Sequence, residues 1–372
     1  MRKILFLTAF PPSKKTAGQN FTRLLLEKLS EDYSIDLFYC EYKGVKADQS
    51  ILCNRNIVVH KFNNSPYMKF LNALMMPFFH PFFTCRFNFY RLFFLKKKSK
   101  YDLIYLDFSQ MFLYGLFFEG RIVMMAHDII HQKYTRSRYI SGFLKLLNLI
   151  FVKAIENKVF SVASQILVFS QKDRNYVKRI YNKDSDIVHF FIDKDILNID
   201  YSDIQFGDYF CLYGAWGRQE NQDMLLWMIE NKIVDFGFDI KIIGTGIPEK
   251  YYEILSNRKN IDLLGFVDDP YKIISGAKAM LAPLTSGAGV KVKVVESLAC
   301  GTPVLGTDVA FEGVDFSIKN ALIKLEKEPS DIKIQLKLLL NIKIDEKENI
   351  RDSFLREYQH DMYMPHNIFR FY

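Results

Sequence analysis

The residues whose types and spacing best suit chemistry lie in one short stretch, APLTSGAGVKVKVVESLACGTPVLG, which spans residues 282–306. Its small and charged residues follow in the order Gly287, Gly289, Lys291, Lys293 and Glu296. Glycine allows a backbone to approach a ligand closely, and the first turn of a helix attracts phosphate. The lysines add positive charge, and Glu296 can accept hydrogen bonds from two adjacent hydroxyl groups. The pattern therefore suits a sugar nucleotide, with its diphosphate at the helix start and its ribose on Glu296.

These side chains need a strand, a loop and a helix to hold them in place. The apolar run at residues 279–283 predicts a strand, and the two glycines predict a loop after it. A helix that carries the lysines and the glutamate ends near Gly301, and a second strand follows Pro303. This order is a βαβ unit, in which ligands bind at the carboxyl ends of the parallel strands.

The same alternation runs along the whole chain. Apolar runs that predict strands recur at residues 3–8, 34–40, 57–62, 103–106, 122–126, 165–169 and 187–191, and again at 209–213, 240–243, 261–264, 280–282 and 304–305. Because helical patterns separate these runs, they predict two parallel α/β sheets. A chain of 372 residues also exceeds what one hydrophobic core usually supports. We therefore expect an N-terminal domain at residues 1–195 and a C-terminal domain at 205–345, with the active site in the cleft between them.

The stretch at residues 282–306 also resembles a known signature, the donor-binding motif of GT-B glycosyltransferases of the family 4 type, or glycosyl transferases group 1. The matching positions are Pro283, Leu284, Gly287, Gly289, Lys293, Glu296, Ala299, Gly301, Pro303 and Val304. The resemblance implies the GT-B fold, in which two Rossmann-like parallel-sheet domains face a central cleft. The sequence departs from the family at Ala288, where the family has its first glutamate, eight residues before Glu296.

By this resemblance, the C-terminal domain binds a nucleotide sugar. Glu296 would bind the ribose hydroxyls, while Lys293 and Arg218 would contact the diphosphate. The segment around Phe266 would hold the base, largely through backbone groups. The expected donor-binding residues are Gly18, Arg218, Gly246, Phe266, Val267, Ser286, Gly287, Ala288, Gly289, Lys291, Lys293 and Glu296. Asn221 is expected to cap the helix that follows Arg218.

In the N-terminal domain, His127 and Asp128 end the predicted strand at residues 122–126. Related enzymes place a histidine or a His–Asp pair here against the transferred sugar or the acceptor. An imidazole can donate a hydrogen bond to a sugar hydroxyl or relay a proton. The expected catalytic residues are His127, Asp128 and Glu296. Weaker candidates, which follow another strand, are Asp107 and Ser109.

The resemblance implies a retaining glycosyltransferase of the hexosyl type that needs no metal ion and no other cofactor. Lysine, arginine and a helix dipole would stabilise the departing diphosphate, which would itself take the proton of the attacking acceptor. Two other interpretations stay open. A GT-B sugar-nucleotide epimerase would convert the donor without an acceptor, and a non-catalytic GT-B partner subunit would keep the fold without turnover. The missing glutamate at Ala288 motivates the second of these.

Charge and composition indicate an anionic partner other than nucleic acid. The net charge is +8, and no nucleic-acid motif is present. Residues 66–98 are dense in aromatic residues and methionine and end in the run Lys96, Lys97 and Lys98. Apolar surface with a basic rim suits the interface of an anionic membrane. Alternatively, these aromatic residues form the core of two buried helices.

We therefore expect the protein in the cytoplasm, peripherally bound to the inner face of the cytoplasmic membrane, with a lipid-linked or surface-polysaccharide glycan as acceptor. The five cysteines lack metal-binding spacing and predict reduced thiols, and no apolar run is long enough to span a membrane. In GT-B proteins a C-terminal helix often crosses back to the first domain, and the resemblance implies the same for residues 346–372.

Overall fold

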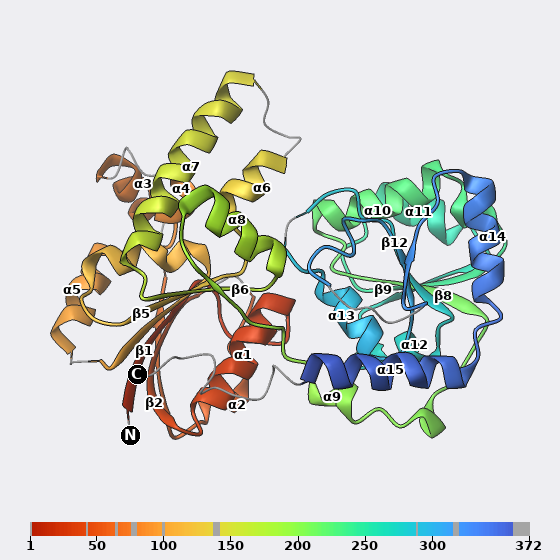
Figure 1. Ribbon diagram of the computed structural model, residues 1–372, viewed down its shortest axis with the longest axis horizontal. Helices are drawn as coiled ribbons and strands as arrows, with labels where there is room; N and C mark the ends of the chain where they lie inside the picture. The colour runs from red at the N-terminus through yellow and green to blue at the C-terminus, as the bar shows by residue number, and fades with distance from the viewer. Residues whose placement is uncertain are drawn as a thin grey trace. The chain divides into compact units, whose positions relative to one another are not determined.

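The computed structural model describes residues 2–41, 44–63, 66–75, 80–98, 101–136, 142–287, 289–314 and 320–359. The chain divides into two compact units, and the boundary falls between Phe191 and Ile192, a little before the predicted end of the first domain at residue 195. Each unit is built around one parallel sheet with helices packed against it (Figure 1). The predicted α/β class with two Rossmann-like domains is confirmed.

In the first unit, the described residues form one seven-stranded sheet in the order β3-β2-β1-β4-β5-β6-β7, with every neighbouring pair parallel. The strands are β1 (Arg2–Thr8), β2 (Tyr33–Cys40), β3 (Ile57–Phe62), β4 (Leu103–Asp107), β5 (Ile122–Ala126), β6 (Gln165–Val168) and β7 (Asp186–Ile187). β4 and β5 are buried along their whole length, because helices cover both faces of a parallel sheet. The strand predicted at residues 187–191 is wrong in extent, since only two residues of β7 pair with β6.

Several helices of this unit begin at a side-chain cap. They are α1 (Ala17–Leu29), α2 (Gln49–Leu52), α3 (Pro66–Met75), α4 (Pro81–Thr84), α5 (Phe89–Lys98), the 3₁₀ helix η1 (Ser109–Phe117), α6 (Ile130–Arg136), α7 (Gly142–Val162) and α8 (Gln171–Tyr181). Thr16 caps α1, and Ser170 caps α8 by accepting from the N–H of Asp173. No helix in the described part of the chain is long and apolar enough to cross a membrane.

The aromatic segment at residues 66–98 is partly core and partly surface. Phe83 on α4 and Phe87 after it are completely buried. By contrast, α3 and α5 keep large apolar side chains more than one-third exposed, namely Tyr67, Phe70, Leu74, Tyr90, Phe93 and Phe94. Each of the two sequence-based alternatives thus describes part of this segment. Residues 76–79 within it lie outside the described residues.

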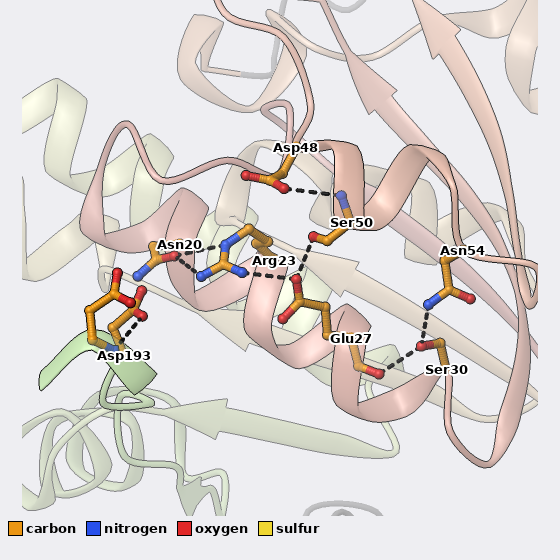
Figure 2. Close-up of polar contacts among 9 residues, drawn as sticks. Asn20, Arg23, Glu27, Ser30, Asp48, Ser50, Asn54 and Asp193 are labelled. Carbon is orange, nitrogen blue, oxygen red and sulfur yellow. Dashed lines mark hydrogen bonds and ion pairs between the residues drawn. The ribbon is translucent and has the colours of Figure 1, made fainter. Parts of the chain in front are cut away.

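Arg23 ties α1 to α2 through a chain of polar contacts, which Figure 2 shows. Its Nε and Nη2 donate to Asn20 Oδ1 at 3.0 and 2.8 Å, and its Nη1 donates to Glu27 Oε1 at 2.8 Å. The same oxygen of Glu27 accepts from Ser50 Oγ, and the Ser50 N–H donates to Asp48 at the start of α2. These contacts hold α1, whose second residue is Gly18, against α2.

The second unit holds a six-stranded sheet in the order β10-β9-β8-β11-β12-β13, again parallel throughout the described residues. Its strands are β8 (Tyr209–Tyr213), β9 (Asp239–Ile243), β10 (Ile261–Gly265), β11 (Ala279–Ala282), β12 (Val304–Gly306) and β13 (Leu322–Lys324). Its helices are α9 (Lys194–Leu197), η2 (Tyr201–Asp203), α10 (Gln219–Glu230), η3 (Ile233–Asp235), α11 (Glu249–Ser256), α12 (Pro270–Gly276), α13 (Val292–Ala299), α14 (Pro329–Leu339) and α15 (Ile344–Gln359). The sequence did not predict β13.

A buried lysine anchors the last described helix, α15, on the second unit. Lys347 is 2% exposed, and its ammonium donates to the carbonyls of Ser275 and Ala277 and to Thr302 Oγ1. Arg351 on the same helix donates to two carbonyl groups of α9. The described part of the tail therefore belongs to the second unit. Residues 360–372 of the predicted returning tail lie outside the described residues.

Candidate functional site

The glycine loop of the second unit leads from the end of β11 into α13. Gly287 and Gly289 both have positive φ angles, 118° and 71°, which only glycine adopts readily. Lys291 is the N-cap residue of α13, and no side chain caps the helix there. The first N–H groups of α13 are therefore available to an anionic group at the carboxyl edge of the sheet. Ala288 lies outside the described residues.

Lys293 lies in the first turn of α13 in a half-buried position. Its Nζ donates to Asn221 Oδ1 at 2.8 Å and lies 3.6 Å from the sulfur of Met224. Burial lowers the pKa of Lys293 to about 7. The negative charges of Glu220 and Glu296 oppose this shift, and the positive charges of Arg218 and Lys291 add to it. The ammonium therefore lies where a bound anion would stabilise its charged form.

Glu296 lies three residues further along α13, on the same face as Lys293. Its Oε1 accepts a hydrogen bond from the Tyr271 hydroxyl at 3.2 Å. Burial raises the pKa of Glu296 to about 7, and the negative charge of Asp193 adds to this, although the Tyr271 hydrogen bond opposes it. Burial and the charge of Glu296 also raise the pKa of Tyr213, at the end of β8. A cation and a carboxylate one turn apart thus share an edge lined by tyrosines.

The glycines at the ends of β8 and β9 have a packing role that needs no ligand. A Cβ on Gly244, whose φ is 118°, would lie 1.9 Å from the carbonyl oxygen of Gly214. A Cβ on Gly246 would lie 2.9 Å from the backbone nitrogen of Gly217. The two turns also bond directly, since the Trp216 N–H donates to the Thr245 carbonyl at 2.9 Å. Glycine is required here because two backbones meet.

The remaining predicted donor residues surround this edge. The side chain of Arg218 is 62% exposed and lies 4.0 Å from Glu220. Phe266, just after β10, is 76% exposed. Ser286 Oγ donates to Asp223 at 3.3 Å, and Lys291 Nζ donates to the Gly289 carbonyl at 2.8 Å. Half-buried positions are taken by Val267 and Lys291.

The predicted capping role of Asn221 is wrong. Arg218 is the N-cap residue of α10, and Asn221 lies inside the helix, where its Nδ2 donates to the Ala215 carbonyl at 2.8 Å. Its Oδ1 is thereby turned toward Lys293. Sequence reasoning also missed Tyr271, whose contact with Glu296 joins residues 25 positions apart. The sequence places Tyr271 in the first turn of α12, two residues after the Asp269 cap, but it gives no indication that the hydroxyl reaches Glu296.

In the first unit, polar side chains from three neighbouring strands meet at Asp107. This carboxylate is completely buried at the end of β4. Its Oδ2 accepts from the hydroxyls of Thr8 and Thr22 at 2.8 and 2.7 Å, and its Oδ1 lies 2.7 Å from His127 Nε2. Since a carboxylate only accepts, Nε2 carries the proton and Nδ1 of a neutral His127 is an acceptor. The weaker sequence candidate is thus the centre of this cluster.

Aromatic rings hold His127 in one orientation. Its ring stacks on Phe108 with centroids 3.7 Å apart. The rings of Phe21 and Phe169 lie edge-to-face with it, with centroid distances of 5.7 and 5.1 Å. Phe108 has a φ of 66°, a costly conformation for a residue with a side chain. A Cβ on Gly18 would lie 3.1 Å from both His127 Nδ1 and the Phe108 ring. Gly18 therefore leaves room for the imidazole at this edge.

Asp128 is directed away from this cluster. Its side chain is 34% exposed and lies 3.3 Å from Lys133 Nζ. Its backbone carbonyl accepts from Ser109 Oγ at 3.2 Å. The structure therefore joins His127 to Asp107 rather than to the neighbouring Asp128. Among the described residues, no three His, Cys, Asp or Glu side chains are grouped so that they could hold a metal ion.

Comparison with known proteins agrees with this geometry. Residues 208–341 match the family model described as Glycosyl transferases group 1. HepE of Anabaena, solved with UDP and glucose, is similar with a TM-score of 0.66 at 14% identity, over 98% of this chain and 96% of HepE. WaaG, a glycosyltransferase involved in lipopolysaccharide biosynthesis, is similar with a TM-score of 0.68 at 14% identity, over 98% of each chain.

A third solved structure, TarM of S. aureus, has a TM-score of 0.66 at 13% identity, over 96% of this chain and 97% of TarM. No curated protein sequence matches this one. The family match falls on the unit that carries Lys293 and Glu296, and the structural matches extend over both units. The resemblance seen in the sequence is therefore confirmed: residues 208–341 of the second unit match the glycosyl transferases group 1 model, and the chain has the GT-B fold.

Proposed function

We propose that this protein is a retaining glycosyltransferase that moves a hexose from a nucleotide sugar to a lipid-linked or surface-polysaccharide acceptor. It would act at the cytoplasmic face of the membrane. One observation carries the proposal: Lys293 and Glu296 lie one turn apart on α13, behind the glycine loop that follows β11. A cation and a carboxylate at this spacing fit the diphosphate and the ribose of one nucleotide.

In this proposal the diphosphate binds at the start of α13. The helix N–H groups and Lys293 would hold it, and the exposed Arg218 at the start of α10 would reach it. A diphosphate beside Lys293 would raise its lowered pKa and keep the ammonium charged. HepE, which is similar in fold, has been solved with UDP and with UDP-glucose, and this supports a nucleotide sugar as the donor.

Catalysis would depend on charge stabilisation without a metal ion. Lys293, Arg218 and the dipole of α13 would stabilise the departing diphosphate. Retention would follow from attack on the same face of the sugar, with the leaving phosphate accepting the acceptor proton. His127 would contact the transferred sugar or the acceptor, and its hydrogen bond to Asp107 would keep the ring in place.

The acceptor assignment rests on the surface of the first unit. The exposed aromatic residues of α3 and α5 lie in the segment whose basic border suits an anionic membrane. Contact through residues 66–98 would bring the protein to a lipid-linked acceptor. WaaG, another protein of similar fold, is involved in lipopolysaccharide biosynthesis, which is in keeping with a glycan acceptor of this kind.

The test is thermal stability of the full chain with UDP, GDP, ADP, CMP and their sugar forms. A nucleotide that binds the native state raises Tm by mass action. Lys293→Met and Glu296→Gln should each weaken binding of the preferred nucleotide about tenfold or more, because each removes a charged partner. Lys259→Met and Glu253→Gln change exposed residues of the same unit and serve as matched controls. Equal loss in the control variants would contradict the site.

The same nucleotide then separates the alternatives. A glycosyltransferase releases nucleoside diphosphate only when an acceptor is present, beyond slow hydrolysis. An epimerase changes the sugar without any acceptor, and a non-catalytic subunit binds the donor and leaves it intact. Chromatography of the donor after incubation, with and without glycolipid extract, distinguishes the three outcomes.

A further inference from the structure

Helix α7 exposes an unusual amount of apolar surface in its first half. None of the residues at 142–151 is buried, and burial begins at Val152. In Figure 1 the first turns of α7 extend beyond the neighbouring elements of the first unit. The exposed apolar side chains, with exposed fractions from 44% to 71%, are Phe143, Leu144, Leu146, Ile150 and Phe151.

The second half of α7 holds this surface rigidly. Val152, Val159 and Phe160 belong to the core of the first unit. Glu156 is completely buried and accepts from the N–H groups of Ile130 and His131 at the start of α6, at 2.7 and 3.1 Å. It also accepts from a tyrosine hydroxyl of α8 at 2.5 Å. The exposed first half of α7 is thus held in place by the packing of the second half in the core of the first unit.

The stretch of sequence that contains α6 and α7 is rich in basic residues. Between residues 130 and 162, Glu156 is the sole acidic residue of the sequence, and it is buried. The basic residues that the structure describes in the same range are Lys133, which pairs with Asp128, and Arg136, Lys145, Lys153 and Lys158. An apolar face bordered by lysine and arginine complements a lipid bilayer with anionic headgroups.

The width of the apolar face favours a bilayer over a protein groove. A partner that binds a helix in a groove contacts one line of residues at i, i+3 and i+7. Successive helical residues point about 100° apart, so Phe143, Leu144 and Leu146 spread over a broad face. A neighbouring apolar helix lies within reach: α3 packs on α4, and the His80 cap of α4 bonds to Asn148 of α7 at 2.8 Å.

We propose that residues 142–151 of α7 insert into the interface of an anionic membrane, while the rest of the helix fixes them to the first unit. This makes α7, rather than the segment at 66–98 alone, the main membrane-binding element. The purpose of this binding, access to a lipid-linked acceptor, rests on the proposed function. Vesicle binding itself requires neither donor nor turnover.

The experiment is co-sedimentation of the full chain with phosphatidylcholine vesicles, with and without phosphatidylglycerol. The double variant Leu144→Ser with Ile150→Ser should lose about tenfold or more in vesicle affinity. The matched control is Leu338→Ser with Ile334→Ser on α14, where the exposed fractions are 67% and 56%, compared with 67% and 55% on α7. Equal loss in both variants, no loss in either, or equal binding to vesicles without phosphatidylglycerol would overturn the proposal.

A second measurement locates the helix in the bilayer. Leu144→Trp fluorescence should be quenched by brominated lipid, whereas Leu338→Trp should not differ from the wild-type background of Trp216 and Trp227. If the serine variant instead abolishes self-association in sedimentation velocity and vesicle binding stays intact, α7 is an interface between copies and the proposal fails. The nucleotide-induced rise in Tm reports the donor site separately, so the two proposals can fail independently.

Discussion

In the second unit, the charged groups at the carboxyl edge of the sheet come from one short stretch of chain, whereas in the first unit they come from separate strands. Lys293 and Glu296 are three residues apart on one helix. Asp107 and His127 end different strands, and the hydroxyl of Thr8 comes from a third. Nearness in sequence made the first pair recognisable, and only folding reveals the second.

The two edges also differ in how their charges are balanced. Asp107 is fully buried but accepts three hydrogen bonds from its own unit, so its charge is satisfied without a ligand. Lys293 and Glu296 both have pKa values shifted to about 7, and burial is the main cause in each case. The edge of the first unit is therefore preorganised without a ligand. At the edge of the second unit, a bound ligand would stabilise the charged forms of Lys293 and Glu296.

The largest expected effect is a loss of stability when the close contact between the two glycine turns of the second unit is disrupted. Gly244→Ala should destabilise the second unit by about 4 kcal/mol or more, because its Cβ would meet a backbone oxygen and its φ is positive. Both tryptophans, Trp216 and Trp227, lie in this unit, so urea unfolding followed by tryptophan fluorescence measures it directly. Gly217→Ala, whose Cβ would meet nothing within 4 Å, is the control.

Gly18→Ala extends this test to the first unit. The atoms nearest to its Cβ would belong to the side chains of His127 and Phe108, which can move by tenths of an ångström. Gly18→Ala should lower the stability of the first unit by about 1 kcal/mol and leave the tryptophan transition of the second unit unchanged.

The contradicting outcome for the second unit is a Gly244→Ala variant that unfolds no more easily than Gly217→Ala. The packed glycine turns would then not be needed for stability, and a direct ligand role for Gly246 would gain support.

The next largest effect is expected at Asp107. An asparagine there cannot accept from both hydroxyls and from His127, so Asp107→Asn should cost the first unit about 2–3 kcal/mol. Hydrogen exchange of β1 and β4 amides measures this loss. Turnover should fall as well, since the imidazole loses its fixed tautomer, while UDP affinity in the second unit should stay unchanged.

Asp128→Asn provides the comparison within the same loop. Its carboxylate is one-third exposed and contacts only Lys133 among the described ion pairs, so the cost should be at most about 1 kcal/mol. A fall in turnover for Asp128→Asn as large as that for Asp107→Asn would restore the sequence-based pairing of His127 with Asp128. A smaller effect would leave Asp107 as the partner that matters.

How far the sequence predicted the fold depended on how apolar and how long each element is. Fully buried strands such as β4 and β5 are uninterrupted apolar runs and were predicted. β13 was not predicted because it has only three residues, none of them fully buried. The opposite error occurred at residues 187–191, where apolar side chains continue after the pairing with β6 has ended.

In the candidate site, too, some residues were predicted from the sequence and others were not. Lys293 and Glu296 were predicted because motif spacing places both on the first turns of one helix. The contact of Tyr271 with Glu296 and that of Asn221 with Lys293 join residues 25 and 72 positions apart. Single-sequence patterns describe neighbours along a helix or strand and contain no record of such contacts, which depend on the order of strands in the sheet.

The smallest expected effect is the pH dependence of donor binding. Lys293 must be protonated to bind a diphosphate, and its pKa is about 7, so affinity should fall as pH rises above that value. Glu296 must be ionised to accept the ribose hydroxyls, and its pKa is also about 7, so affinity should fall as pH drops below it. On each side of the maximum, the affinity should change by at most about tenfold per pH unit. Calorimetric titration of UDP between about pH 6 and pH 8 should show a maximum near the middle of this range.

Variants assign each slope to its residue and bring the two edges back into comparison. Lys293→Met should remove the alkaline slope, and Glu296→Gln should remove the acidic slope that exceeds the protonation of UDP itself. Asp107→Asn should leave the UDP profile unchanged, because its charge is satisfied within the first unit. A flat wild-type profile would mean that Lys293 and Glu296 do not change protonation with the ligand, and the contrast between a ligand-dependent edge and a self-sufficient one would be lost.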